Sequence, residues 1–192
     1  MVKVCGIYAT LCLYLFFYAL LSQERKAAVM NKQYRGFHQL PHSTASNELQ
    51  EGCIVLEGGA FRGLYGEGVL DALMLENINM RCTIGVSAGA MNGLNYVSGQ
   101  IGRSIRMNLK YRHDNRYVGR KALRSSNGLI GFDFAFHQAD KEYPFDRKRF
   151  FQFDRRFLAV ATNCETAEPV YFEKAGRNVL VIFQYGVKEL VV

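Results

Sequence analysis

The chain has 192 residues, of which 49% are apolar and 21% are charged. This length suits one domain with a sizeable core and excludes two comfortable ones, and the composition excludes a mainly disordered chain. The formal net charge of +7 favours anionic partners, either nucleic acid or a phospholipid surface.

The cysteines and histidines show no metal-binding pattern. The five cysteines are scattered without CxxC spacing, and the histidines offer a single HxxxH spacing, His38 and His42, in which Pro41 does not favour the helix that would place both on one face. We therefore expect free thiols in a reducing compartment, and neither a metal ion nor a cofactor.

Residues 4–21 form a continuous apolar run without a charge, which is just long enough to span a bilayer as a helix. Three interpretations of residues 1–29 stay open: a membrane anchor, a cleaved signal peptide, or a spurious extension ahead of Met30. Leu20 and Leu21 make a poor cleavage site before Ser22. As an anchor, the run would hold the domain at the cytoplasmic side of a membrane, and otherwise we expect a cytoplasmic protein.

Residues 30–51 are polar and lack periodicity, which predicts a linker. Order is expected to begin with a short buried strand at residues 53–56, followed by a glycine-rich loop and then a helix that ends near Glu76. The core face of this helix is predicted to hold Val69, Leu70, Leu73 and Met74.

The glycine-rich loop at residues 58–63 lies between that strand and helix. Such a loop exposes backbone N–H groups that can hold negative charge at a helix N-terminus. It could bind the phosphates of a dinucleotide or form an oxyanion hole for a neighbouring nucleophile. The dinucleotide fingerprint G-x-G-x-x-G has Ala60 in place of its middle glycine.

The next predicted strand, residues 82–84, leads into Gly85-Val86-Ser87-Ala88-Gly89 and then into a helical pattern. A serine with glycines two residues away on either side, between strand and helix, is the sequence form of a nucleophile elbow. The elbow favours the oxyanion-hole interpretation of the glycine loop, because the two motifs are separated by about one βαβ unit.

Three segments resemble the patatin-like phospholipase family: residues 56–63 (LEGGAFRG), 68–73 (GVLDAL) and 84–90 (IGVSAGA). The likeness continues through residues 92–103 and covers roughly residues 53–176. It implies a three-layer α/β/α fold with a mainly parallel central sheet, incomplete at the C-terminus. It also implies hydrolysis of lipid acyl esters by a Ser–Asp dyad, with Ser87 as the nucleophile and Gly85 and Gly89 framing the elbow. The oxyanion amides implied by the family are those of Gly58, Gly59, Ala60, Phe61, Arg62 and Gly63.

Two departures from the family pattern affect this site. Ala60 stands where the family usually has glycine, and a positive φ there would cost about 1 kcal/mol. The family's catalytic aspartate lies in a later Asp-Gly-Gly or Asp-Gly-Ala motif, but the sequence contains no Asp-Gly pair. We therefore assign none of the later aspartates as the base.

Residues 177–192 do not follow the family pattern. One hypothesis is that the reading frame is lost near Gly176, so that the continuation carrying the aspartate is missing. The alternative is that residues 179–183 and 187–192 form genuine short strands.

Two stretches are rich in basic residues. Residues 103–124 carry eight Arg or Lys side chains and one acid, and residues 147–156 carry five more beside phenylalanines. They could bind single-stranded nucleic acid, contact an anionic membrane, or form a solvated surface whose aromatics pack inward. The serine site favours a phospholipid or another lipid ester as partner over nucleic acid. Residues 156–162 and 170–173 then predict a hairpin around a turn at 163–169.

The sequence is thus divided into an apolar segment (1–29), a linker (30–51), a partial patatin-like domain (52–176) and an atypical tail (177–192). Three functions remain as hypotheses. The first is a serine acyl hydrolase acting on lipids. The second is a non-catalytic lipid- or membrane-binding remnant of such a domain, and the third is a nucleotide-binding module that uses the glycine loop.

Overall fold

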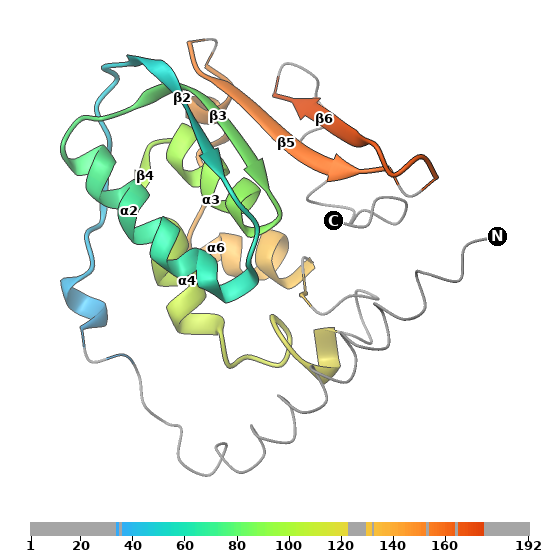
Figure 1. Cartoon of the computed structure of the whole chain (residues 1–192). Coiled ribbons are helices and arrows are strands. Elements are labelled where there is room, and N and C mark those ends of the chain that lie inside the picture. The colour runs from blue at the N-terminus through green and yellow to red at the C-terminus, as the bar shows by residue number, and fades with distance from the viewer. Residues whose placement is uncertain are drawn as a thin grey trace. The chain divides into compact units, whose positions relative to one another are not determined.

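The computed structural model describes residues 34, 36–122, 130–131, 133–152, 154–163 and 165–174 (Figure 1). The predictions for residues 1–29 and 177–192 lie outside these residues. The elements in chain order are η2 (Phe37–Gln39), β1 (Ser43–Thr44), β2 (Gln50–Leu56), η3 (Ala60–Arg62), α2 (Gly63–Leu75), β3 (Met80–Val86), α3 (Ala88–Val97), β4 (Gln100–Ile101), α4 (Arg103–Tyr111), η4 (Phe134–Ala139), α6 (Asp140–Glu142), α7 (Arg147–Phe150), β5 (Arg156–Thr162) and β6 (Pro169–Glu173).

The main sheet has the strand order β2-β3-β5-β6. Strands β2, β3 and β5 are parallel, and β6 pairs with β5 in the antiparallel sense. The connection from β2 through α2 to β3 is a βαβ unit, which parallel neighbours require because a tight turn cannot join them. The structure therefore confirms the predicted α/β class with a mainly parallel sheet, and it confirms the predicted hairpin as β5 and β6.

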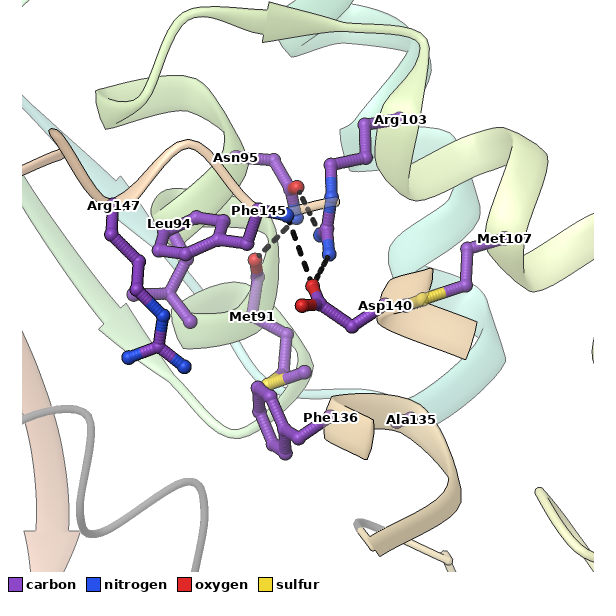
Figure 2. A pocket seen from close by; sticks show the side chains of 10 residues that line it. All are labelled: Met91, Leu94, Asn95, Arg103, Met107, Ala135, Phe136, Asp140, Phe145 and Arg147. Carbon is purple, nitrogen blue, oxygen red and sulfur yellow. Dashed lines mark hydrogen bonds and ion pairs between the residues drawn. The ribbon is translucent and has the colours of Figure 1, made fainter. Parts of the chain in front are cut away.

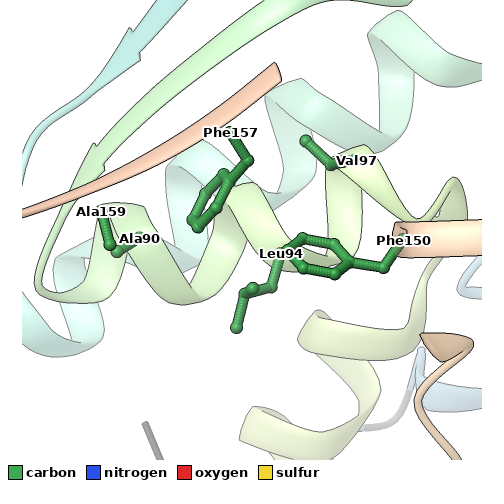
Figure 3. Close-up of a cluster of buried hydrophobic side chains, with 6 residues drawn as sticks. All are labelled: Ala90, Leu94, Val97, Phe150, Phe157 and Ala159. Atoms are coloured by element: carbon green, nitrogen blue, oxygen red, sulfur yellow. The ribbon is translucent and has the colours of Figure 1, made fainter. Parts of the chain in front are cut away.

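One face of this sheet is covered by α3 (Figure 1). Ala90, Leu94 and Val97 of α3 pack on Phe157 and Ala159 of β5, with Phe150 of α7 completing the cluster (Figure 3). Burial of Phe157 and Phe150 is complete. Phe150 in the second basic stretch and Phe157 just after it thus build the core, as the inward-packing interpretation predicted, although Phe151 remains 37% exposed.

A second core cluster joins α2 to the end of α3. Leu70 and Met74 of α2 pack with Tyr96, Ile101 and Ala45. Leu70 and Met74 were predicted on the core face of this helix, but Val69 is 41% exposed, so its placement there was wrong. Glu67 and Asp71 are buried on α2 instead, because both carboxylates accept hydrogen bonds from the neighbouring α4 region.

The opposite face of the sheet carries an apolar row. Val55, Ile84 and Leu158 are register partners on β2, β3 and β5, so their side chains share one face. Val55 is 70% exposed, and Tyr171 farther along the same face is 59% exposed. The prediction of a buried first strand was wrong, because β2 is an edge strand that begins at Gln50. The described helices pack on the other face, so the second outer layer of the predicted arrangement is not among the described residues.

The segment before β2 is more ordered than its polar composition indicated. Ser43 and Thr44 form β1, which pairs with β4, and Ala45 is buried against the second core cluster. Within the described part of the chain, no helix has the length and apolar character needed to cross a membrane. Residues 4–21, the predicted span, are outside that part.

Candidate active site

Ser87 is the one residue between β3 and α3. Its backbone has φ 52° and ψ −121°, and its side chain is exposed. A non-glycine residue in this region of φ/ψ space typically stores about 1–3 kcal/mol of strain, which the surrounding packing must compensate. The strand, the abrupt turn and the helix reproduce the geometry predicted for a nucleophile elbow, with the hydroxyl standing at the sheet edge.

The two glycines of the elbow allow close backbone packing. A Cβ on Gly89 would lie 2.4 Å from the carbonyl oxygen of Leu56, at the end of β2. A Cβ on Gly85 would lie 2.6 Å from Cα of Ala90. Both distances are impossible for a side chain, so these positions require glycine for steric reasons and not for their φ angles.

The glycine-rich loop approaches Ser87 directly. β2 and β3 are adjacent and parallel, so their C-terminal ends meet at one edge of the sheet. A Cβ on Gly58 would lie 3.1 Å from Cβ of Ser87 and 3.8 Å from its Oγ. The loop and the elbow therefore form a single site, although Gly58 and Ser87 are 29 residues apart in the sequence.

The loop amides fall into two groups. The N–H of Arg62 donates to the carbonyl oxygen of Gly59 at 3.0 Å, and the N–H of Gly63 donates to the carbonyls of Ala60 and Phe61. The amides of Gly58, Gly59, Ala60 and Phe61 donate to no acceptor among the described residues. Ala60 has φ 48°. Its backbone therefore adopts the positive φ that is costly for a residue other than glycine.

The comparisons with known proteins agree with this arrangement. The family model described as patatin-like phospholipase matches residues 54–174. This range contains the glycine loop and the elbow and is more than half of the chain. The chain belongs to the patatin-like phospholipase family. It is also similar to the uncharacterized protein YjjU of Escherichia coli (strain K12), with 25% identity over 135 residues. The alignment covers 68% of this chain and 38% of YjjU, so the chain spans well under half of that relative's length.

Asn92 is a residue of this patatin-like site that the sequence analysis missed. Its Nδ2 donates to the carbonyl oxygen of Gly63 at 3.0 Å, and its side chain is buried. This bond ties the start of α2, just after the glycine loop, to the helix that follows Ser87. A polar residue on the otherwise apolar face of α3 was the only signal in the sequence.

Three described aspartates after the elbow are engaged in other contacts. Asp114 pairs with Arg116 at 2.7 Å, Asp140 pairs with Arg103 at 2.8 Å, and Asp146 accepts a hydrogen bond from the N–H of Arg149. Ser87 Oγ forms no hydrogen bond to any residue in the described ranges. No group of three or more metal-ligating side chains is found there either.

Two acids on α2 have raised pKa values, but both face away from the elbow toward α4. Burial raises the pKa of Glu67 to about 8, and Asn108 donates to its Oε1 at 2.6 Å. Burial raises the pKa of Asp71 to about 6, and the N–H of Gly102 donates to its Oδ1 at 2.9 Å. These acids connect α2 to α4, and the apolar pattern of α2 did not predict them.

A small pocket begins one helical turn after Ser87. The N–H of Met91 donates to the carbonyl of Ser87 at 3.2 Å, and Met91 lines the pocket (Figure 2). The Arg103–Asp140 ion pair crosses it, and Arg103 Nη1 also donates to Oδ1 of Asn95 at 2.8 Å. The remaining lining is mostly apolar: Leu94, Met107, Ala135, Phe136 and Phe145, with Arg147. The free volume is about 20 Å³, close to the space of one water molecule, so an acyl chain would enter only if lining side chains moved.

Several arginine side chains of the two basic stretches form contacts within the fold. Arg103 is buried, Arg106 donates to the carbonyls of Leu40 and Pro41, and Arg155 donates to carbonyls of α3. Among the described residues, Lys148 and Arg120 are examples of basic side chains that remain exposed. Arg103, Arg106 and Arg155 are thus used in contacts within the fold, which reduces the basic surface that the two stretches present.

Proposed function

We propose that the chain is a serine acyl hydrolase domain that acts on lipid esters, with Ser87 as its nucleophile. The observation that carries this proposal is the placement of an exposed, backbone-strained serine beside a glycine loop whose first amides are unengaged. Membership of the patatin-like phospholipase family supports a lipid ester as the substrate class.

The proposed reaction begins when Ser87 Oγ attacks the ester carbonyl carbon and a bond forms between them. The carbonyl electrons move to oxygen, and the amides of Gly58 and Gly59 stabilise the resulting negative charge. Loss of one such donor usually costs about 3 kcal/mol of barrier. Collapse of the intermediate expels the alcohol, and water then releases the fatty acid from Ser87. The amides of Arg62 and Gly63 are not assigned to this hole, because they already donate within the loop.

The serine proton needs an acceptor, and no described residue forms a hydrogen bond with Ser87 Oγ. The family resemblance implies an aspartate in a later Asp-Gly motif, which the sequence lacks. This observation favours a second candidate function, a lipid-binding domain that keeps the fold without efficient turnover. The third hypothesis is a nucleotide-binding module, which would need an acidic residue at the end of the strand after the glycine loop. The arrangement does not favour it, because β3 leads into Ser87 and the glycine loop contacts that serine.

A fluorophosphonate probe and a fluorogenic short-chain ester test the proposal together. We expect the purified chain to be labelled, and Ser87→Ala to lose both labelling and ester cleavage. Ser43→Ala is the matched control, because Ser43 is exposed on β1 and lies outside the site. If Ser87→Ala and Ser43→Ala behave alike in both assays, Ser87 is not a nucleophile in this chain. Binding to phosphatidylcholine vesicles by both variants would then favour the lipid-binding alternative.

A further inference from the structure

A second pocket lies at the end of the sheet opposite to Ser87. Arg155 directly precedes β5 and lines this pocket, whereas Ser87 directly follows the parallel strand β3. The volume of the pocket is about 390 Å³, which falls within the range of small-molecule sites. The residues that line it are Ser46, Asn47, Leu49, Val97, Arg149, Gln152, Asp154 and Arg155.

Arg155 is the central charged residue of this pocket, and it is only 8% exposed. Its Nη1 donates to the carbonyls of Tyr96 at 2.8 Å and Val97 at 3.2 Å, at the C-terminal end of α3. The guanidinium also lies over the Tyr96 ring, 4.7 Å from the centroid. Its Nε and Nη2 are buried and find no acceptor among the described residues. Buried hydrogen-bond donors normally have an acceptor, and the guanidinium group also carries a full positive charge. Two buried donors of Arg155 without an acceptor therefore indicate a place for a ligand.

Two further cations surround Arg155. Arg149 lines the same pocket, with its Nη2 donating to the carbonyls of Ala45 and Ser46. Lys174 donates to the carbonyl of Gln152, which also lines the pocket. Burial, together with the charge of a neighbouring arginine, lowers the pKa of Arg155 to about 10 and that of Lys174 to about 8. The exposed carboxylate of Asp154 is the acid among the lining residues, so positive charge exceeds negative charge here.

We propose that this pocket binds an oxyanion of the phosphate class, held mainly by Arg155 with Arg149 beside it. The planar guanidinium fork matches the oxygens of a phosphate in a bidentate way, which an ammonium group cannot do. A bound dianion would satisfy the unused donors of Arg155 and relieve the repulsion among the three cations. The phosphate could be free in solution or be the head group of an anionic phospholipid, and the two sources share this chemistry. The proposal is independent of the function assigned to Ser87.

Isothermal titration calorimetry with inorganic phosphate at constant ionic strength tests this site on the full chain. We expect saturable binding that Arg155→Gln weakens by at least about tenfold, because charged hydrogen bonds to the anion are lost. Asp154→Asn should tighten binding by about two- to fivefold, since it removes one exposed negative charge from the rim. The matched control is Lys148→Gln, which loses one positive charge from an exposed position on α7 outside the pocket and should leave the affinity unchanged.

The Asp154→Asn variant keeps the proposal testable if Arg155→Gln does not fold, because the Asp154 side chain is exposed. Absence of phosphate binding by the wild-type chain would overturn the proposal. Equal weakening by Lys148→Gln and Arg155→Gln would overturn it as well, since this result indicates a general charge effect. No gain from Asp154→Asn would also overturn it, because the anion would then not lie beside this carboxylate.

Vesicle binding identifies the source of the phosphate. The chain is sedimented with phosphatidic acid vesicles and with phosphatidylcholine vesicles, with and without inorganic phosphate. Binding to phosphatidic acid that phosphate inhibits, and that Arg155→Gln abolishes, assigns the pocket to a lipid head group. Phosphate binding in the calorimeter without such vesicle binding assigns it to a soluble phosphate.

Discussion

Gly58 lies so close to Ser87 that a methyl group on it would be 3.1 Å from Cβ of the serine and 3.8 Å from its Oγ. The loop and the elbow therefore fit together so tightly that a side chain at their contact would force one of them to shift. This relationship links two motifs that are far apart in the sequence, and it makes the reactivity of Ser87 sensitive to the smallest possible addition at Gly58.

We expect Gly58→Ala to slow fluorophosphonate labelling of Ser87 by at least about tenfold, because the loop amides must move by a few tenths of an ångström from their positions. Gly68→Ala is the matched control, since a Cβ there meets nothing within 4 Å. Because Gly68 lies inside α2, that control should label normally and gain about 0.4–1 kcal/mol in the free energy of unfolding. Normal labelling of Gly58→Ala would contradict the close contact.

Gly89→Ala tests the steric role of the elbow glycine. The new Cβ would lie 2.4 Å from the carbonyl oxygen of Leu56, so the elbow must separate from the end of β2. We expect a loss of about 2–4 kcal/mol in the free energy of unfolding, measured by urea denaturation. Gly66→Ala is the comparison, because its Cβ would make an ordinary contact of 3.7 Å with Asn92. Similar stability of the two variants would show that the elbow is not packed as described.

The buried acids on α2 predict a stability that falls as pH rises. Burial raises the pKa of Glu67 from 4.5 to about 8 and that of Asp71 from 3.8 to about 6, so the folded state holds more protons than the unfolded state between these values. Below about pH 4 both carboxyl groups are protonated, and their contribution to the free energy of unfolding is then largest. This contribution is lost as the pH rises toward 8. The change attributable to Glu67 should be of the order of a few kcal/mol.

Urea midpoints measured from pH 5 to pH 8.5 check this dependence. Glu67→Gln should make the urea midpoint less dependent on pH. At pH 8 this variant should be more stable than the wild type, because the glutamine buries no charge at position 67. Glu76→Gln, an exposed acid just past α2, should leave the profile unchanged. A wild-type midpoint that rises with pH over this range would refute the assignment.

The sequence predicted the elements around Ser87 well because the relevant signals are local. The apolar strand, the glycines at fixed offsets and the apolar face of α3 all act within a few residues, and the structure places them as expected. The burial of Glu67 and Asp71 could not be predicted, since it depends on donors supplied by Gly102 and Asn108 on a distant segment. The edge position of β2 was equally hidden, because a run of Cys, Ile, Val and Leu looks the same in a central strand.

The exposed apolar row on the sheet predicts self-association of the chain. Val55 is 70% exposed on β2, which has no strand partner on its outer side among the described residues, so an open strand edge and an apolar surface coincide there. We expect Val55→Lys to lower light scattering of the purified chain at high concentration. Val69→Lys makes the same change at an exposed position on α2 and should have a smaller effect. Equal effects of the two variants would mean that net charge, and not this face of the sheet, controls association.

The unassigned base predicts a distinctive pH profile for cleavage at Ser87. The sequence lacks the Asp-Gly motif that would carry the partner carboxylate, and such general-base assistance is commonly worth about 10²–10⁴ in rate, so we expect slow Ser87-dependent ester cleavage. The rate should rise with pH without levelling off, because hydroxide must take the serine proton, and added imidazole should accelerate it. The measurement is the difference between wild type and Ser87→Ala, which subtracts direct hydrolysis by imidazole. A rapid rate that reaches a plateau above pH 6 would instead show that a carboxylate of this chain serves as the base.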